Sequence, residues 1–404
     1  MALGADGSDA VHAFLEAANG ITEPIENEGD RTRILLKLYE LVAKVESPWD
    51  TFTRLYITEP AVAGAVKVLK EARIIERWRQ NGNSPMTTVE LAGLTDGFDP
   101  ALLHRLLRLL VANHLIEMTS DGKFQPAKFC MKLAESDFST GAQFYEDYFV
   151  PMCHHMPAFF AKTGYKNPSN SRQTVFNSAF RTKDGLFEYL EARPGQGEVF
   201  NVSQRTSTSE QGRWTSIYPS GALLREGDPQ LPLLVDVGGS IGQDVQCFLE
   251  RHPGTASRVY LEDIPSVLAD ENSTLVKDVK KVPYDFFTPQ PIKNARAYYL
   301  HHILHDWPDK QARKILEMQK TAMKPGYSRI LIHDHVMSDD GPVHPHVAVS
   351  DVLMMAFGAA KERTEKEWDA LMASAGLRIV KIWRVPSAKE AVIEAEVAPD
   401  MPRL

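Results

Sequence analysis

The chain has 404 residues, a length that predicts two or three structural units rather than a single core. Its composition, 43% hydrophobic and 24% charged residues, is that of an ordinary soluble globular protein. The formal net charge of −8 disfavours broad electrostatic attraction to nucleic acid or to an anionic membrane.

The cysteines and the absence of export signals indicate the compartment. Cys130, Cys153 and Cys247 are far apart and show no paired metal or disulfide spacing. The chain begins without the basic start and apolar run of a signal peptide, and no later segment reaches the length of a membrane span. We therefore expect reduced thiols, no membrane partner and a cytoplasmic location.

The first third of the chain predicts helices and a small hairpin. Apolar residues at helical spacing predict helices over residues 31–48 and 60–78. Residues 86–129 then predict a Thr-capped short helix, a turn, a Leu-rich helix and a hairpin around Asp121-Gly122. That order is typical of a winged helix-turn-helix, which either packs or binds DNA. The acidic chain and scattered basic residues favour packing.

Residues 136–225 predict further helices separated by polar loops, with 166–174 as an exposed loop. A stripe of apolar side chains at helical spacing is either core or the wall of a pocket. Its members are Phe144, Tyr145, Phe149, Met152, Met156 and Phe159.

From about residue 230, buried strands alternate with amphipathic helices. Strands are predicted in "LPLLVDVG", "SRVYLEDI", "ARAYYLHHIL" and "YSRILIHDHV", and helices in "QDVQCFLERH" and "DKQARKILEMQKTAMKPG". This alternation predicts an α/β fold with a Rossmann-like, doubly wound, mostly parallel sheet. Ligands of such sheets bind at the carboxyl ends of the strands, near the point where strand order reverses.

The segment "VDVGGSIGQDV", residues 235–245, is a glycine turn between the first strand and its helix. Asp236 lies near the strand end, and Gly238 and Gly239 permit a tight turn with close ligand approach. The next strand ends at Asp263, a carboxylate suited to the ribose hydroxyls of an adenosine ligand. The lysine and Ser/Thr of a triphosphate loop are missing, whereas a dinucleotide remains possible.

Six motifs in order resemble the S-adenosylmethionine-dependent O-methyltransferases of the plant caffeic acid and fungal secondary-metabolite types. They are "LLVDVGGSIGQD", "VYLEDIP", "VPYDFF", "YYLHHILHDWPD", "LIHDHVM" and "AAKERTEKEWDALMASAGL". The similarity runs from roughly residue 60 to 390. It implies a class I methyltransferase fold with an N-terminal winged-helix dimerisation domain, and S-adenosylmethionine as the ligand of the glycine turn.

The resemblance also implies cofactor contacts. Gly238 approaches the amino acid portion, Asp263 holds the ribose, and Asp285 contacts the adenine with Phe286 against the ring. Without the family motif, the sequence would predict Asp285 as a solvated turn residue and Phe286 as a core residue. Ser240 stands where the family usually has a third glycine, and His301 where relatives carry Lys or Arg. The implied cofactor-binding residues are Asp236, Gly238, Gly239, Asp263, Asp285, Phe286 and His301.

His305 is the predicted general base. It follows a strand and precedes a helix opened near Pro308, which places it at the ligand edge of the sheet. An imidazole of ordinary pKa is largely neutral in the cytosol and can take a phenolic proton during methyl transfer. Asp306 is its neighbour, but adjacent side chains rarely face each other. The resemblance supplies Asp334, one methylene shorter than the usual Glu, and Glu362 as orienting carboxylates.

The histidines also raise the question of a metal. His301, His302, His305, His333 and His335 cluster in two motifs, but H-E-x-x-H is absent. The metal-dependent small catechol methyltransferases lack this long N-terminal region. We therefore expect no catalytic metal, and hydrogen-bonded structural roles for the histidines at 302, 333 and 335.

The sequence says least about the acceptor substrate. Met354, Met355 and Phe357 either line an apolar pocket for a flat aromatic acceptor or pack in the core. We expect residues 1–135 to form a helical winged-helix dimerisation domain, and residues 136–404 to form the substrate-pocket and catalytic domain. By resemblance, the protein is a homodimer.

The sequence leaves three alternative hypotheses for the function. The first is an O-methyltransferase acting on a hydroxyl of an aromatic secondary metabolite. The second is a methyltransferase-like cyclase or pericyclase that keeps S-adenosylmethionine as a fixed cation, a function left open by Asp334 and His301. The third is a winged-helix regulator with salt-dependent DNA binding, which the acidic balance disfavours.

Overall fold

The structure is a computed structural model, and it describes residues 5–210, 213–269, 275–341, 343–385 and 388–399. Contacts divide the chain into two units, residues 1–57 and 58–404. The contact division falls at a different place from the predicted domain boundary at residue 135. That boundary stays a prediction. No helix among the described residues is long and apolar enough to cross a membrane.

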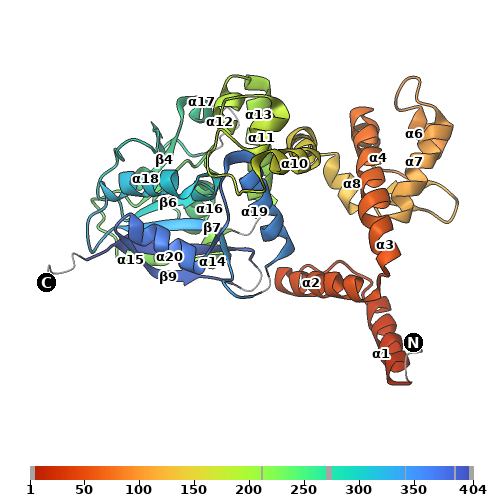
Figure 1. The fold of residues 1–404 in the computed structure, drawn as a ribbon, viewed down its shortest axis with the longest axis horizontal. Coiled ribbons are helices and arrows are strands. Elements are labelled where there is room, and N and C mark those ends of the chain that lie inside the picture. Colours follow the sequence, from red (N-terminus) through yellow and green to blue (C-terminus); the bar gives the residue numbers. More distant parts are fainter. Residues whose placement is uncertain (1–4, 211–212, 270–274, 342, 386–387, 400–404) are drawn as a thin grey trace. The chain divides into compact units, whose positions relative to one another are not determined.

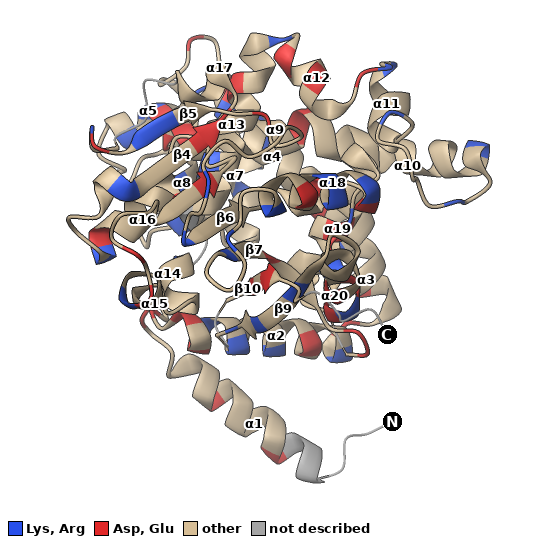
Figure 2. Ribbon diagram, turned by 90° about the vertical axis from the view of Figure 1, so that its left-hand side faces the viewer, with Lys and Arg blue, Asp and Glu red and all other residues tan. Residues whose placement is uncertain are grey.

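The first unit is built from helices with little buried surface, one of which, α2, carries alternating charge. Positive and negative side chains are interspersed along α2 (Figure 2), where they form i,i+3 and i,i+4 pairs. α3 opens on a capping box between Ser47 and Asp50. The elements are α1 (Ala5–Asn19), α2 (Glu28–Val45), α3 (Pro48–Thr53) and the π-helix η1 (Arg54–Thr58).

The second unit begins with the helices and hairpin expected from the sequence. The predicted helix over 60–78 is two helices, because Arg73 adopts a left-handed conformation (φ 58°) that interrupts the hydrogen-bond ladder. Thr87 caps α6 in a capping box with Glu90, and the hairpin turns at the expected Asp121-Gly122. The elements are α4 (Glu59–Glu71), α5 (Ile74–Gln80), α6 (Thr88–Ala92), α7 (Pro100–Ala112), β1 (Ile116–Met118), β2 (Phe124–Pro126) and α8 (Lys128–Leu133).

A helical segment follows, as predicted, and residues 166–174 form a mostly exposed loop. The apolar stripe is largely core: Phe144, Met152 and Phe159 are buried in one aromatic cluster with Phe357 of α19. The elements are α9 (Ser136–Phe144), η2 (Tyr145–Phe149), α10 (Val150–Thr163), α11 (Val175–Phe180), α12 (Leu186–Glu191), α13 (Pro194–Glu210), α14 (Trp214–Ile217) and α15 (Gly221–Arg225).

The catalytic half contains the predicted sheet. The strand order is β5-β4-β3-β6-β7-β10-β9, parallel from β5 to β7, with β10 antiparallel to both neighbours. The strands are β3 (Leu234–Val237), β4 (Val259–Asp263), β5 (Lys280–Pro283), β6 (Ala297–His301), β7 (Arg329–Met337), β8 (Arg363–Thr364), β9 (Leu377–Trp383) and β10 (Glu390–Val397). The helical elements are α16 (Gln243–Arg251), η3 (Ala256–Arg258), α17 (Pro265–Leu268), η4 (Leu304–Asp306), α18 (Asp309–Lys320), α19 (Pro345–Gly358) and α20 (Glu365–Ser374).

Helices cover both faces of this sheet (Figure 1). Alternating strand residues supply the two cores: Val235 packs on the side of α18 and α20, and Leu234 packs on the side of α14 and α16. Chain order reverses between β3 and β6, so the carboxyl ends of these strands are the expected ligand edge. The glycine turn follows β3, and His305 follows β6.

Candidate active site

The glycine turn after β3 is as tight as its sequence suggests. Gly238 has φ +73°, and its backbone N–H donates to the carbonyl of Glu262 at 2.8 Å. A Cβ added at Gly238 would lie 2.6 Å from a methyl carbon of Ile303 and 3.8 Å from the ring of Phe286. A side chain at 238 would therefore displace Ile303 and strain the backbone of this turn.

Ser240 continues this turn in an unusual conformation for a non-glycine residue, with φ 54°. Its backbone N–H donates to Asp263 Oδ2 at 2.8 Å, which joins the turn to the end of β4. The other oxygen of Asp263 accepts from the N–H of Ile264 at 2.7 Å.

Asp236 is a buried carboxylate beneath the turn. It is 1% exposed, and neither carboxylate oxygen has a hydrogen-bond partner among the described residues. Burial and the neighbouring charge of Asp244 raise the pKa of Asp236 well above its ordinary value. A cationic group beside Asp236 would relieve this cost of desolvation.

The predicted adenine contacts lie in the loop after β5. Asp285 is exposed and accepts from the backbone N–H of Phe287 at 2.9 Å, which is also what a turn residue does. Phe286 is half-buried. Its ring packs edge to face with that of Trp307, and the ring centres are 6.1 Å apart.

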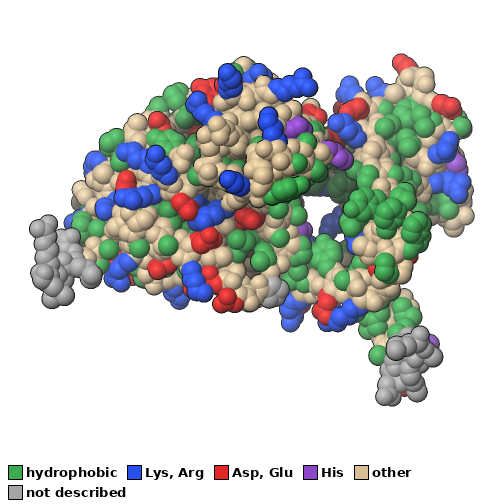
Figure 3. Space-filling view, viewed as in Figure 1, with side chains coloured by type: hydrophobic (Ala, Val, Ile, Leu, Met, Phe, Trp, Pro, Cys, Tyr) green, Lys and Arg blue, Asp and Glu red, His purple; other side chains and the backbone are tan. Residues whose placement is uncertain are grey.

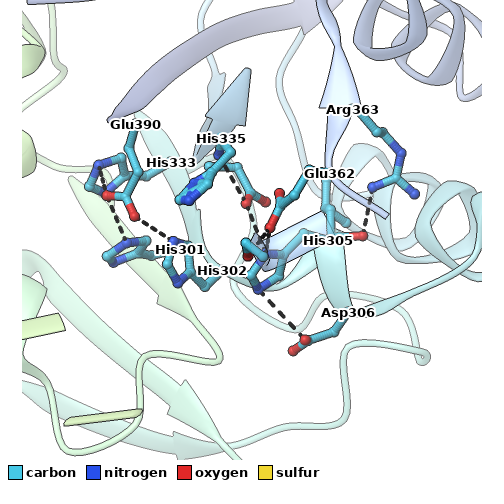
Figure 4. A network of polar contacts seen from close by, with 12 residues as sticks. His301, His302, His305, Asp306, His333, His335, Glu362, Arg363 and Glu390 are labelled. Carbon is cyan, nitrogen blue, oxygen red and sulfur yellow. Dashed lines mark hydrogen bonds and ion pairs between the residues drawn. The ribbon is translucent and has the colours of Figure 1, made fainter. Parts of the chain in front are cut away.

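His305 lies in η4, just after β6, and is 4% exposed. Its Nδ1 is 3.0 Å from Glu362 Oε1, within hydrogen-bond distance, and 3.4 Å from Asp334 Oδ1 (Figure 4). The structure therefore brings the three predicted catalytic residues together, with Glu362 as the closer carboxylate. Ser350 also donates to the same Glu362 oxygen at 2.5 Å and fixes its orientation.

Asp306 corrects one expectation from the sequence. Its carboxylate Oδ1 lies 3.6 Å from His305 Nε2, so these adjacent side chains do face each other (Figure 4). The tight 3₁₀ turn over residues 304–306 differs from an extended strand, where neighbouring side chains point to opposite faces. Each ring nitrogen of His305 thus has a carboxylate near it.

The charge state of His305 also differs from the expectation. Burial alone would lower the pKa of His305, but Asp334, Glu362 and Asp306 outweigh it and raise the pKa to about 10. The same pairing lowers the pKa of Glu362 to about 2 against the effect of burial. Burial raises the pKa of Asp306 to about 6, although the imidazolium opposes this. His305 is therefore largely protonated at neutral pH, not neutral.

Arg363 is a positioning residue that sequence reasoning missed. It is fully buried, and it donates to the carbonyl oxygens of Leu304 and Trp307 at 2.8 and 2.9 Å. These bonds hold the turn that carries His305, one at the residue before it and one two residues after it. Its place directly after Glu362 in the "KERT" motif was the available signal.

A cavity opens beside this turn. It has an empty volume of about 530 Å³, part of which is open solvent, and Asp306 and Trp307 form part of its wall. Phe187 stacks on Trp307 at 5.5 Å between ring centres. Of the three predicted pocket residues, Met354 and Phe357 line the cavity and Met355 does not.

The other histidines form a second polar cluster. His301 Nδ1 lies 2.7 Å from Asp244 Oδ2, and its Nε2 faces Glu390 Oε2 at 3.7 Å. Burial alone would lower the pKa of His301, but Asp244 and Glu390 raise it well above its ordinary value. His302 bonds Glu390 Oε1 at 2.6 Å, so it is hydrogen-bonded as expected, and its structural role stays a prediction.

Comparisons with known proteins agree with this fold and site. The sequence profile of the O-methyltransferase domain matches residues 167–378. O-methyltransferase mfmE of Annulohypoxylon moriforme is 44% identical over 386 residues, covering 95% of each chain. O-methyltransferase asqD of Emericella nidulans is 35% identical over 316 residues, covering 77% of this chain and 81% of its own.

Solved structures give the same answer for the fold. LepI in complex with SAH and a substrate analogue has a TM-score of 0.87 at 28% identity, covering 96% of this chain and 99% of its own. OxaC in complex with SAH and oxaline has a TM-score of 0.82 at 24% identity, covering 96% and 98%. The chain belongs to the S-adenosylmethionine-dependent O-methyltransferases, an enzyme family represented here by relatives from fungal secondary metabolism.

Proposed function

We propose that this enzyme methylates a phenolic or enolic hydroxyl of an aromatic, polyketide-type secondary metabolite, with His305 as the general base. The observation that carries this proposal is the orientation of the imidazole. Glu362 holds Nδ1 at 3.0 Å, and Nε2 is directed toward Asp306, a wall residue of the cavity. An acceptor hydroxyl in that cavity is therefore on the side of Nε2.

The residues around the glycine turn fit the cofactor. The unpartnered carboxylate of Asp236 suits the ammonium group of its amino acid portion, and the glycines at 238 and 239 keep side-chain atoms out of the turn beside it. Asp263 has lone pairs left for ribose hydroxyls, and Phe286 offers a ring face. When bound, the cofactor supplies a methyl group on a positively charged sulfur.

Two predicted contacts receive less support. Both ring nitrogens of His301 are directed at protein carboxylates, so we do not carry this residue into the proposed cofactor set. Asp285 is exposed and stays a prediction from the motif alone.

The raised pKa of His305 suits proton abstraction from a phenol. An imidazole of pKa 6.5 would accept a proton from a phenol of pKa about 10 only against a gap of about 3.5 units. With a pKa of about 10 the two groups are matched. The same value leaves only about one molecule in a thousand with a neutral imidazole at pH 7, so the reaction gains from higher pH.

Glu362 and Asp334 have different proposed roles beside His305. Glu362 accepts the Nδ1–H, fixes the tautomer and stabilises the imidazolium that forms. Asp334 is at 3.4 Å, outside direct hydrogen-bond distance for an aligned N–H, and contributes its charge. Its shorter side chain explains why Glu362, not Asp334, holds the ring.

A test is incubation with methyl-labelled S-adenosylmethionine and a panel of phenolic polyketides, followed by assay for S-adenosylhomocysteine and labelled product. The proposal expects both to form together, and His305→Gln to reduce both. Failure of every phenol and enol in the panel, with cofactor binding intact, would contradict it.

A second candidate is a pericyclase or cyclase that retains the cofactor. Two observations favour it: LepI, described as "A Pericyclic Reaction enzyme", has a TM-score of 0.86 at 28% identity, and His305 is largely an imidazolium. An imidazolium donates a hydrogen bond instead of accepting a proton. Conversion of a substrate without formation of S-adenosylhomocysteine would identify this activity.

For the N-terminal region we propose dimerisation. None of the residues in α2 or α3 is buried, and the side chains of Trp49, Phe52 and Tyr56 are exposed. Figure 3 shows hydrophobic side chains on the surface of the N-terminal part of the chain. Exposed apolar surface of this kind is typical of a protein interface. We also propose that residues 1–135 form a dimerisation domain with a winged helix, that nucleic acid is not a partner, and that the enzyme acts in the cytoplasm.

A further inference from the structure

A set of buried polar side chains connects two parts of the proposed cofactor site. We call Glu262, Gln290, Gln319 and Tyr284 the polar network. The first three are fully buried, and Tyr284 is 8% exposed. Buried polar groups in proteins are nearly always hydrogen-bonded, so their partners show which segments the network holds in place.

The network joins β4, the loop after β5 and α18. Gln290 Nε2 donates to Glu262 Oε2 at 2.7 Å and to Gln319 Oε1 at 2.8 Å. Gln319 Nε2 donates to the hydroxyl of Tyr284 at 3.1 Å, and that hydroxyl donates to the carbonyl oxygen of Thr288 at 2.8 Å. Three segments that are separate in the sequence are therefore connected by one continuous set of buried side chains.

Residues 284–292, called the nucleoside loop below, contain the predicted adenine contact Phe286. The network holds this loop at both ends. The backbone N–H of Tyr284 donates to the carbonyl oxygen of Asp263 at 2.9 Å, at the end of β4. Gln290 Oε1 accepts from the backbone N–H two residues further along the chain, also at 2.9 Å. The position of Phe286 relative to Asp263 therefore depends on the network.

Glu262 links the network to the glycine turn. Its carbonyl oxygen accepts from the backbone N–H groups of Gly238 and Gly239 at 2.8 and 3.1 Å, and the next residue is Asp263, the predicted ribose contact. Since Leu261 packs on the side of α16, the side chain of Glu262 lies on the opposite face of the sheet, toward α18. The backbone of Glu262 thus bonds the turn while its carboxylate bonds the network.

This arrangement keeps a carboxyl group in the interior at a cost. Glu262 Oε1 is buried and has no hydrogen-bond partner among the described residues. Burial raises the pKa of Glu262 to about 7, although the bond from Gln290 opposes this. An apolar side chain would avoid the cost of desolvation. Stability alone therefore does not explain the network.

The nucleoside loop also packs against the turn that carries His305. The rings of Phe286 and Phe287 both contact Trp307, with ring centres 6.1 and 4.8 Å from that of the tryptophan. These contacts do not involve the polar network, so they remain when one of its hydrogen bonds is removed. We therefore expect a broken network to shift the loop without unfolding it.

We propose that the polar network positions the nucleoside of the cofactor. It holds the nucleoside loop against β4 so that Phe286 and Asp263 contact the same nucleoside. Its members are positioning residues, since their side chains act through the loop and the strand. The inference rests on the proposed cofactor site, in which Asp263 binds the ribose and Phe286 lies against the adenine.

The test measures the affinities of two compounds for the full-length protein by calorimetry. S-adenosylhomocysteine has both ends of the cofactor and no charge on sulfur, whereas methylthioadenosine has the nucleoside without the amino acid portion. Tyr284→Phe keeps the ring and removes the hydroxyl between Gln319 and Thr288. It should weaken binding of both compounds by the same factor, about 3–10-fold.

Tyr327→Phe is the matched control, because it removes a hydroxyl that accepts from the backbone N–H of Asp228, outside the network. It should leave both affinities unchanged. Unchanged affinities in Tyr284→Phe would overturn the proposal. A loss for S-adenosylhomocysteine without a loss for methylthioadenosine would also overturn it, since the effect would then not act on the nucleoside.

Two substitutions of Glu262 separate positioning from stability. Glu262→Gln still offers an oxygen to Gln290, so it should keep both affinities even if Tm falls. Glu262→Leu offers none and should weaken both compounds. Equal affinities in the two variants would contradict the proposal, and Tyr284→Phe decides the matter if Glu262→Leu does not fold.

Phe286→Ala distinguishes failure of this inference from failure of the proposed cofactor site. If Phe286→Ala leaves the affinity for methylthioadenosine unchanged, the proposed site is wrong. If Phe286→Ala weakens binding, the combination with Tyr284→Phe should lose less than the sum of the two single effects, because the network acts through the loop that carries this ring. Fully additive losses would reduce the network to a structural role and overturn the proposal.

Discussion

The ring of His305 has Glu362 and Asp334 near one nitrogen and Asp306 near the other. In the proposed mechanism the neutral imidazole is the active form, so kcat/KM should rise about tenfold per pH unit and level only near pH 10. A profile of kcat/KM against pH, which reports the free enzyme, measures this directly. A break near pH 6.5 would contradict the environment described here.

A matched variant separates this effect from ionisation of the acceptor. Asp306 raises the pKa of His305, so Asp306→Asn should move the break expected near pH 10 in the kcat/KM profile to lower pH. Ionisation of the acceptor would leave the break where it is. The position of the break is informative even if the variant changes KM, because Asp306 also lines the cavity.

Removal of the base should reduce turnover far more than binding. His305→Gln is expected to lower kcat by about 10²- to 10⁴-fold with cofactor affinity nearly unchanged, because the proton moves only as the transition state forms. Steady-state kinetics and calorimetry measure the two quantities. Glu317→Gln, on the exposed face of α18, is the control. An acceptor with an ionised hydroxyl should partly rescue His305→Gln, and full activity without such an acceptor would mean that the base is elsewhere.

Glu362 and Asp334 should differ in importance. Glu362→Gln removes the charged partner of Nδ1 and should lower kcat more than Asp334→Asn, whose carboxylate is 3.4 Å away and not hydrogen-bonded to the ring. Both should also move the pH break downward, since each carboxylate raises the pKa of His305. Equal kinetic losses would show that orientation by Glu362 is not decisive.

At the scale of the element, the turn between β3 and α16 is the proposed cofactor site. Gly238→Val should abolish binding of S-adenosylmethionine, because φ is +73° and the added carbon would meet Ile303 at 2.6 Å. Isothermal calorimetry measures the affinity. Gly195→Val is the matched control, since a Cβ at Gly195 meets nothing within 4 Å. Undiminished affinity in a folded Gly238→Val protein would exclude this turn as the site.

At the scale of the whole molecule, the exposed apolar residues of the N-terminal helices predict self-association. Sedimentation velocity should give a dimer mass that falls to the monomer on dilution or on substitution Phe52→Glu. Val89→Glu, at an exposed residue of α6, is the control. A monomer mass at every concentration would contradict the proposed dimer.

The sequence by itself predicted four strands of the sheet and the glycine turn, and it proposed His305 as the catalytic base. Apolar strands of four to nine residues alternate with amphipathic helices, and local periodicity is enough to predict each of these elements. β5, β9 and β10 were not predicted. β5 and β9 carry exposed positions, so their strands lack a continuous apolar run. The helix break at Arg73 was also missed, because a left-handed residue leaves no mark in an apolar pattern.

Only the tertiary structure decided how the site is charged. Asp306, Asp334 and Glu362 come from three separate segments, and only folding brings all three carboxylates within 3.6 Å of the His305 ring. Their distances fix its protonation, which no local pattern contains, since electrostatic interaction depends on separation and burial. In the same way, the register of β6, β7 and β10 places His301, His333 and Glu390 together across 89 residues of sequence.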